Sequence, residues 1–171
     1  MNENSKRKIE LITLGSALTA LVVVLQMLGS TIRFGTFSVS LVLIPIVIGA
    51  ATCGKYIGAW LGFVFGMAVL LSGDAALFMG ISDYGTIITV LLKGTACGFI
   101  AGLVYELLAK KSKTLGAVAS AIVCPVVNTG IFVLGCFVFF KDFILTPSYI
   151  IFQILKLAVI AISLRTITAY L

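Results

Sequence analysis

The chain has 171 residues, of which 61% are hydrophobic and only 11% are charged, with a net charge of +6. A soluble domain of this size carries about twice that share of charged residues, so the composition excludes a water-soluble fold and favours a membrane protein. Histidine is absent and the four cysteines stand far apart without a CxxC pair, so we expect no metal ion and no cofactor.

Long apolar runs alternate with short polar connections along the chain. The first run, which begins at Ile9, follows the basic head MNENSKRK and is too long for the apolar core of a signal peptide, so we interpret it as a retained helix. The second run contains Pro45, which lacks a backbone donor and is expected to bend its helix. We predict one all-α membrane domain over 1–171, a bundle of six spanning helices at about 9–28, 38–51, 56–71, 86–108, 115–140 and 148–164.

The distribution of lysine and arginine predicts the orientation of this bundle. An even number of spans puts both termini on one side, and that side holds eight basic residues, whereas Arg33 and Lys141 lie on the other. By the positive-inside rule we expect both termini in the cytoplasm. The positive charge is then mostly a topology signal and does not indicate a nucleic-acid partner.

Glycine recurs at every fourth position of GKYIGAWLGFVFG, from Gly54 to Gly66, and the pattern returns over 94–102. Residues four apart share one helix face, so these glycines form a groove that lets another backbone approach closely. A shorter version in the first helix consists of Ser16 and Ala20. Two interpretations stay open: the seams pack the six helices together, or one seam faces another membrane subunit.

Two lysines fall inside predicted helices, although a charge near the bilayer centre costs about 2.5–3.5 kcal/mol. Lys93 lies about two turns below the external surface, and Lys156 lies near the middle of the last span, with Gln153 almost one turn above it. Neither lysine has an acidic residue at helical spacing. We therefore predict a cavity that accepts an anion, with snorkelling to the headgroups as the alternative. Asn128, three residues after Pro125, is a further polar candidate at depth.

Two external connections combine aromatic residues with glycine. STIRFGTFSVS carries Arg33 and Phe37, and SGDAALFMGISDYG carries Asp83 and Tyr84. Such loops can close on a ligand and exclude water. Anchoring of the aromatic side chains at the membrane interface is the alternative.

The sequence argues against an enzyme, because it has no histidine, no embedded pair of carboxylates and no Walker loop. Two classes of function remain. One is a membrane subunit that captures a small anionic solute and relies on partners for energy. The alternative is a stand-alone, gradient-driven carrier or channel, for which neither inverted repeats nor rings of charge are visible.

Four stretches resemble one family: RFGTFSVSLVLIPIVIGAATCGKYIGAWLGFVFG, TVLLKGTACGFIAGLVYELLAKK, PVVNTGIFVLG and FQILKL. In this order they resemble the substrate-binding S component of an energy-coupling factor (ECF) transporter, and the resemblance covers nearly the whole chain. It implies a six-helix subunit of a prokaryotic cell membrane that binds a water-soluble vitamin or a related micronutrient from outside. It also implies delivery of that vitamin with a transmembrane T component and two ABC-type ATPases, which hydrolyse the ATP.

The resemblance also implies roles for individual residues. Small residues of the first helix dock on the coupling subunit, usually as Ala-xxx-Ala, and Ser16-xxx-Ala20 is the nearest match here. Positions 128 and 156 resemble those at which riboflavin-type members hold their ligand. With the glycine ladder added, the predicted docking residues are Ser16, Ala20, Gly54 and Gly58. The predicted substrate-binding residues are Arg33, Phe37, Asp83, Tyr84, Thr89, Lys93, Asn128, Gln153 and Lys156.

The predicted substrate follows from charge. A basic cavity without an embedded acid favours a carboxylate or a phosphate over a cation such as thiamine. The acidic residue that leads into the second helix of riboflavin-type members is missing here. We therefore expect pantothenate first, and folate or riboflavin after it.

Overall fold

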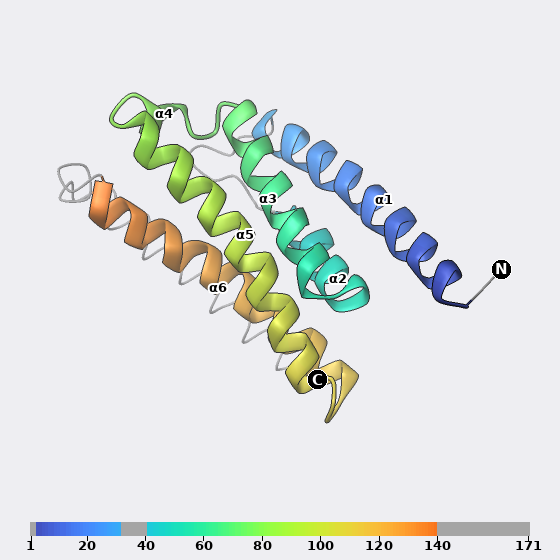
Figure 1. The fold of residues 1–171 in the computed structure, drawn as a ribbon. Helices are drawn as coiled ribbons and strands as arrows, with labels where there is room; N and C mark the ends of the chain where they lie inside the picture. The colour runs from blue at the N-terminus through green and yellow to red at the C-terminus, as the bar shows by residue number, and fades with distance from the viewer. Residues whose placement is uncertain (1–2, 32–40, 140–171) are drawn as a thin grey trace.

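The computed structural model describes residues 3–31 and 41–139, and this part of the chain is helical throughout, apart from short connections (Figure 1). It forms five helices of more than ten residues and one helix of a single turn. In chain order they are α1 Glu3–Thr31, α2 Leu43–Cys53, α3 Lys55–Leu71, the short α4 Ala76–Met79, α5 Asp83–Leu108 and α6 Lys113–Phe139. In space, α3 lies between α1 and α5, and α5 lies between α3 and α6.

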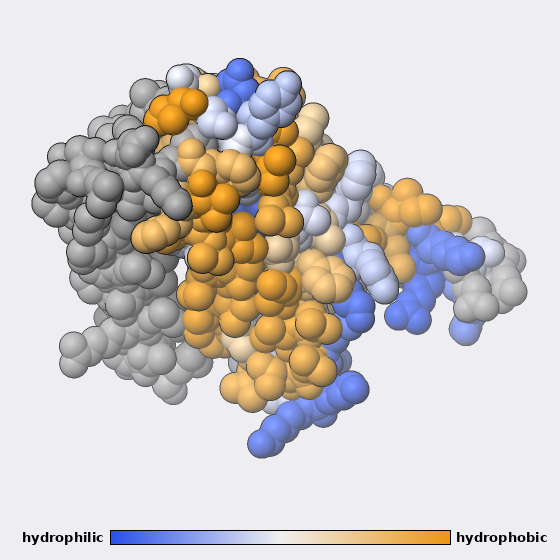
Figure 2. Space-filling view, turned by 60° about the vertical axis from the view of Figure 1, so that its left-hand side comes forward, coloured by the Kyte–Doolittle hydropathy of each residue, from blue (hydrophilic) through white to orange (hydrophobic). Residues whose placement is uncertain are grey.

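Three of these helices are long and apolar enough to cross a membrane: Ser5–Ser30, Asp83–Leu108 and Lys113–Phe139. The helices α2 and α3 are apolar but shorter. Figure 2 shows a broad hydrophobic surface over the described helices, as expected for contact with lipid. The expected sixth span at 148–164 lies outside the described residues, so the count of six spanning helices is not confirmed.

The helix bounds differ from the predicted ones at several points. α1 starts six residues before position 9, because the helix continues through the polar head. α5 starts at Asp83 instead of 86, because Ser82 caps it: the Ser82 hydroxyl oxygen accepts a hydrogen bond from the Gly85 N–H at 3.3 Å. The connection before α5, predicted as a loop, contains α4.

The prediction that Pro45 bends the second helix is wrong. α2 begins at Leu43, so Pro45 occupies its first turn. The N–H groups of a first turn have no acceptor within the helix, and a proline there removes no hydrogen bond. The helix is short because it begins late, and not because it is broken.

The glycine ladder of α3 packs directly against the backbone of α5. The facing pairs are Gly58 with Gly98, Gly62 with Gly94 and Gly66 with Val90. A methyl group added at Gly58 would lie 2.6 Å from the Gly98 carbonyl oxygen, and one added at Gly62 would overlap the Gly94 carbonyl. Of the two interpretations of this seam, internal packing is therefore the one that the structure supports.

The corner between α2 and α3 consists of Gly54 alone, whose φ of +92° favours glycine. Glu106, near the end of α5, holds this corner in place. Its Oε2 accepts a hydrogen bond from Lys55 Nζ at 2.9 Å, and its Oε1 accepts one from the Lys55 backbone N–H at 3.4 Å. The corner is thus fixed to the same helix that the glycine seam contacts.

Candidate functional site

The half of the α5–α6 contact nearer the start of α5 gathers several of the predicted polar residues. Thr89 and Lys93 lie one turn apart on α5, and Asn128 and Phe132 lie one turn apart on α6. The two helices run antiparallel, and a methyl group at Gly135 of α6 would overlap the Thr89 side chain. These four residues therefore lie at neighbouring levels of one helix contact.

Lys93 is half-buried, and its ammonium group is directed at α6. The Nζ atom lies 4.7 Å from the centroid of the Phe132 ring. The negative face of an aromatic ring attracts a cation, by about 0.5–1 kcal/mol at exposed sites and by about 2 kcal/mol or more where water is excluded. The ring thus stabilises a positive charge at the level of Lys93.

Phe132 also contacts the short helix α4. The rings of Phe78 and Phe132 meet edge to face, with centroids 5.3 Å apart and an angle of 88° between the planes. α4 therefore lies over the end of the α5–α6 contact at which α5 begins, and Phe132 lies between α4 and the ammonium of Lys93. Sequence reasoning did not find Phe132, because its role depends on how three separate segments meet.

Asn128 supplies an unsatisfied acceptor. Its side-chain oxygen Oδ1 is buried and has no hydrogen-bond partner among the described residues. A buried polar atom without a partner costs about 1–3 kcal/mol, so such an atom in a native structure asks for an explanation. An N–H or O–H donor on a ligand would satisfy it.

The remaining candidates on α5 occupy other positions. Thr89 is only 3% exposed and fills the space beside Gly135, so it belongs to the helix contact. Asp83 and Tyr84 are exposed in the first turn, and Tyr84 lies nine residues, or about two and a half turns, from Lys93. Tyr84 is therefore on the opposite side of α5, and the structure does not bring the two together. Outside the described residues lie Arg33, Phe37, Gln153 and Lys156.

A polar contact joins the C-terminal part of α1 to the connection between α3 and α4. Gln26 is 6% exposed, and its Nε2 donates to Asp74 Oδ2 at 2.6 Å and lies 3.3 Å from Ser72 Oγ. Ser72 ends α3, and α4 begins four residues later. This contact holds the segment that carries Phe78 over the site.

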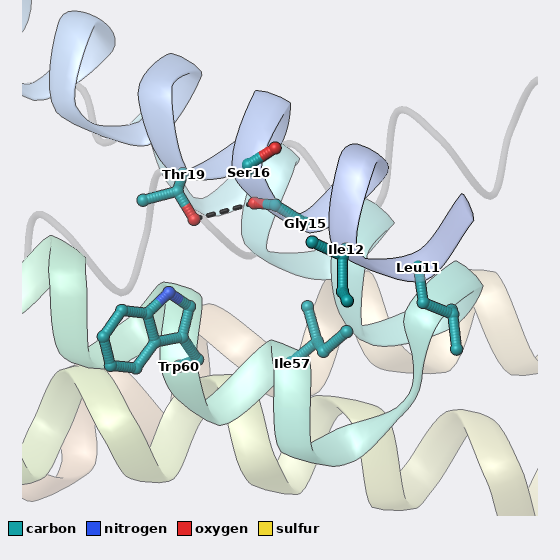
Figure 3. Close-up of a pocket in the computed structure, with 7 residues that line it drawn as sticks. All are labelled: Leu11, Ile12, Gly15, Ser16, Thr19, Ile57 and Trp60. Carbon is teal, nitrogen blue, oxygen red and sulfur yellow. Dashed lines mark hydrogen bonds between the residues drawn. The ribbon is translucent and has the colours of Figure 1, made fainter. Parts of the chain in front are cut away.

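The predicted docking residues Ser16 and Ala20 are both exposed on α1. Beside them, a cavity of about 400 Å³ lies between α1 and α3 (Figure 3). Its lining consists of Leu11, Ile12, Gly15, Ser16 and Thr19 from α1 and of Ile57 and Trp60 from α3. We call this cavity the α1–α3 groove.

The family model for the substrate-specific component of ECF transporters matches residues 10–169. The chain belongs to this family. No curated protein and no solved structure gives a significant match. An ECF substrate-specific component is a substrate-binding subunit in the cell membrane of a prokaryote and not an enzyme, and it works with a T component and ATPases.

One of the two docking residues that the glycine ladder predicted is not accessible. Gly58 is buried, and a methyl group there would meet the Gly98 carbonyl and Ala50, so no partner of the ECF complex can reach this position. Gly54, at the α2–α3 corner, is partly exposed, so its docking role stays a prediction, as do those of the exposed Ser16 and Ala20.

Proposed function

We propose that the chain binds an anionic, water-soluble vitamin between α5 and α6 and passes it to the cytoplasm in a complex with a T component and two ATPases. The observation that carries this proposal is the ammonium group of Lys93 directed at Phe132, one turn above the unsatisfied oxygen of Asn128. A charge at this depth marks a substrate pathway more often than a packing contact.

The chemistry of the surroundings favours a ligand with a negative charge and a donor. No acidic residue stands between Asp83 and Glu106 on α5 or anywhere in α6. Lys93 would attract a carboxylate or phosphate, and Asn128 would accept from a hydroxyl or an amide N–H. Pantothenate combines a carboxylate with hydroxyl and amide donors, and it is our first choice of substrate, before folate and riboflavin.

The orientation that we propose puts both termini in the cytoplasm. The N-terminal end of α1 and the α5–α6 connection lie at the same end of the molecule (Figure 1). These two places carry six of the basic residues: Lys6, Arg7, Lys8, Lys110, Lys111 and Lys113. The positive-inside rule assigns this end to the cytoplasm, so α4 and the start of α5 face the outside.

Substitution of Lys93 tests the binding proposal. We expect Lys93→Ala to weaken pantothenate binding tenfold or more, a change of about 1.4 kcal/mol, because the ligand loses its countercharge. Isothermal titration of the purified chain measures this affinity. The matched control is Lys110→Ala, which removes the same charge from an exposed position and should leave affinity unchanged. If pantothenate affinity is unchanged both in Lys93→Ala and in Lys156→Ala, the anion site is refuted.

The docking proposal is tested on α1. We expect Ala20→Trp to abolish co-purification with the T component and the ATPases while the solitary chain still binds its vitamin, because Ala20 is exposed and remote from Lys93. A bulky ring at this position prevents the close approach that small residues allow. Co-purification at the normal level would show that another surface makes the contact.

A further inference from the structure

The α1–α3 groove has a wall made almost wholly of carbon. Leu11, Ile12, Ile57 and Trp60 supply most of it. The Thr19 hydroxyl donates to the Gly15 carbonyl at 2.7 Å, so its proton is already used within the helix (Figure 3). Water inside such a groove would find few partners, whereas hydrocarbon would lose nothing.

The size of the groove indicates what can occupy it. From Leu11 to Thr19 it follows α1 for about 12 Å at 1.5 Å per residue. A groove of this length, with a volume of about 400 Å³, accommodates part of one extended hydrocarbon chain.

Basic residues continue the line of the groove toward the N-terminus. Arg7 precedes Leu11 by four residues and Lys8 precedes Ile12 by four, so both share the face of the lining residues. Both are exposed. Glu10 lies on the side of α1 away from Ile12, but it follows Arg7 by three residues, and Glu3 precedes Arg7 by four, so both carboxylates neighbour Arg7. Lys8 has no acidic residue three or four positions away, so the positive charge at the end of the groove comes mainly from Lys8.

We propose that the α1–α3 groove is a binding site for an anionic membrane phospholipid. One acyl chain lies along the carbon wall between α1 and α3, and the phosphate of the headgroup contacts Arg7 and Lys8. The groove shares Ser16 with the face that we propose for docking on the coupling subunit, so we expect the lipid in the solitary chain.

The chain contains one tryptophan, and Trp60 lines the groove with 55% of its surface exposed. Its fluorescence therefore reports on the lipid in the groove. The full chain is reconstituted in vesicles of phosphatidylcholine and phosphatidylglycerol, in which either one or the other lipid carries brominated acyl chains that quench tryptophan. Quenching gives the binding constant of phosphatidylglycerol relative to that of phosphatidylcholine. We expect this relative binding constant to be about three or more. Equal quenching by the two lipids would overturn the proposal.

Two variants test the headgroup contact and the chain contact separately. Arg7→Gln with Lys8→Gln should bring the relative binding constant close to one, whereas Lys110→Gln with Lys111→Gln, which removes equal charge at the same end of the molecule, should leave it unchanged. An equal loss in both pairs would show only a general attraction of charge. Thr19→Phe fills the groove and should also abolish the preference. A preference that persists in Thr19→Phe would place the lipid outside the groove and would refute the site.

Discussion

α5 packs against α3 on one side and against α6 on the other, and the two contacts are built differently. Toward α3, glycines bring the two backbones together, and an added methyl group would meet a carbonyl, as at Gly62 and Gly94. Toward α6, side chains fill the space: Lys93 lies over Phe132, and Ser120 reaches across to the Ala101 carbonyl. The contact of α5 with α3 is thus made mainly by main-chain atoms, whereas side chains make much of its contact with α6.

This difference explains why the candidate site lies on the α6 side. In a bilayer the hydrophobic effect does not drive helices together, so close packing of small residues must hold α3 to α5. Such a contact leaves no room for a ligand. Polar side chains inside a membrane protein are expensive, and they gather where a substrate uses them. A rigid glycine seam behind α5 therefore supports a polar contact in front of it.

The largest effect is expected where the main-chain contact is broken. Gly62→Ala puts a methyl group onto the Gly94 carbonyl, which cannot move without shifting α5. We expect a loss of about 2–3 kcal/mol in the free energy of unfolding, as measured by denaturation of the purified chain in detergent.

The matched control for this change is Gly15→Ala. A methyl group there lies 3.7 Å from Ile57, which is an ordinary contact. Replacement of a helical glycine by alanine favours the helix by about 0.5–1 kcal/mol, so this variant should be as stable as the original or slightly more stable. Equal behaviour of Gly15→Ala and Gly62→Ala would show that the seam is not closed by main-chain contact.

A smaller effect is expected on the α6 side. Ser120 is fully buried, and its hydroxyl lies 2.9 Å from the Ala101 carbonyl oxygen of α5 and 2.8 Å from that of Gly116. Ser120→Ala should cost about 0.6–1.7 kcal/mol, the range of interhelical hydrogen bonds in membrane proteins. Thr52→Ala is the control, because the contacts of the exposed Thr52 hydroxyl lie within its own helix, with the Ile48 carbonyl at 2.8 Å and with Cys53 Sγ at 3.5 Å. If Ser120→Ala lowered the free energy of unfolding as much as Gly62→Ala does, the two contacts of α5 would not differ in the way described.

For the described helices, the sequence predicted the ends better than the starts. α3 and α5 end at residues 71 and 108, where the apolar runs were predicted to end, but α1, α2 and α5 start three to six residues from the predicted positions. Starting points depend on local hydrogen bonds, as at Ser82, or on where a proline falls within the first turn, as at Pro45. The glycine ladder identified a seam, but only the facing helix shows that the seam lies inside the molecule.

The candidate site was predicted in part. Lys93 and Asn128 stand out in the sequence because a charge and an amide are rare at membrane depth. The partners of such residues are not visible in a sequence, since the contact of Lys93 with Phe132 depends on how α5 and α6 are placed. Tyr84 was predicted as part of a loop that closes on the ligand. It lies instead in the first turn of α5, and its position nine residues before Lys93 puts it on the opposite side of that helix.

The smallest effect on stability, and the clearest sign of function, is expected at Asn128. Its buried Oδ1 has no partner among the described residues, so Asn128→Leu removes an unsatisfied acceptor and keeps a side chain of similar length. We expect the free energy of unfolding to stay the same or to rise by up to about 1 kcal/mol, because the buried oxygen no longer lacks a partner. Pantothenate affinity should fall tenfold or more, since the ligand loses an acceptor.

A residue that served packing alone would behave in the opposite way: its substitution would lower the free energy of unfolding and leave pantothenate affinity unchanged. Denaturation and titration of the same preparation separate the two outcomes, and loss of stability with unchanged affinity would show that the α6 side of α5 is a packing contact like the α3 side.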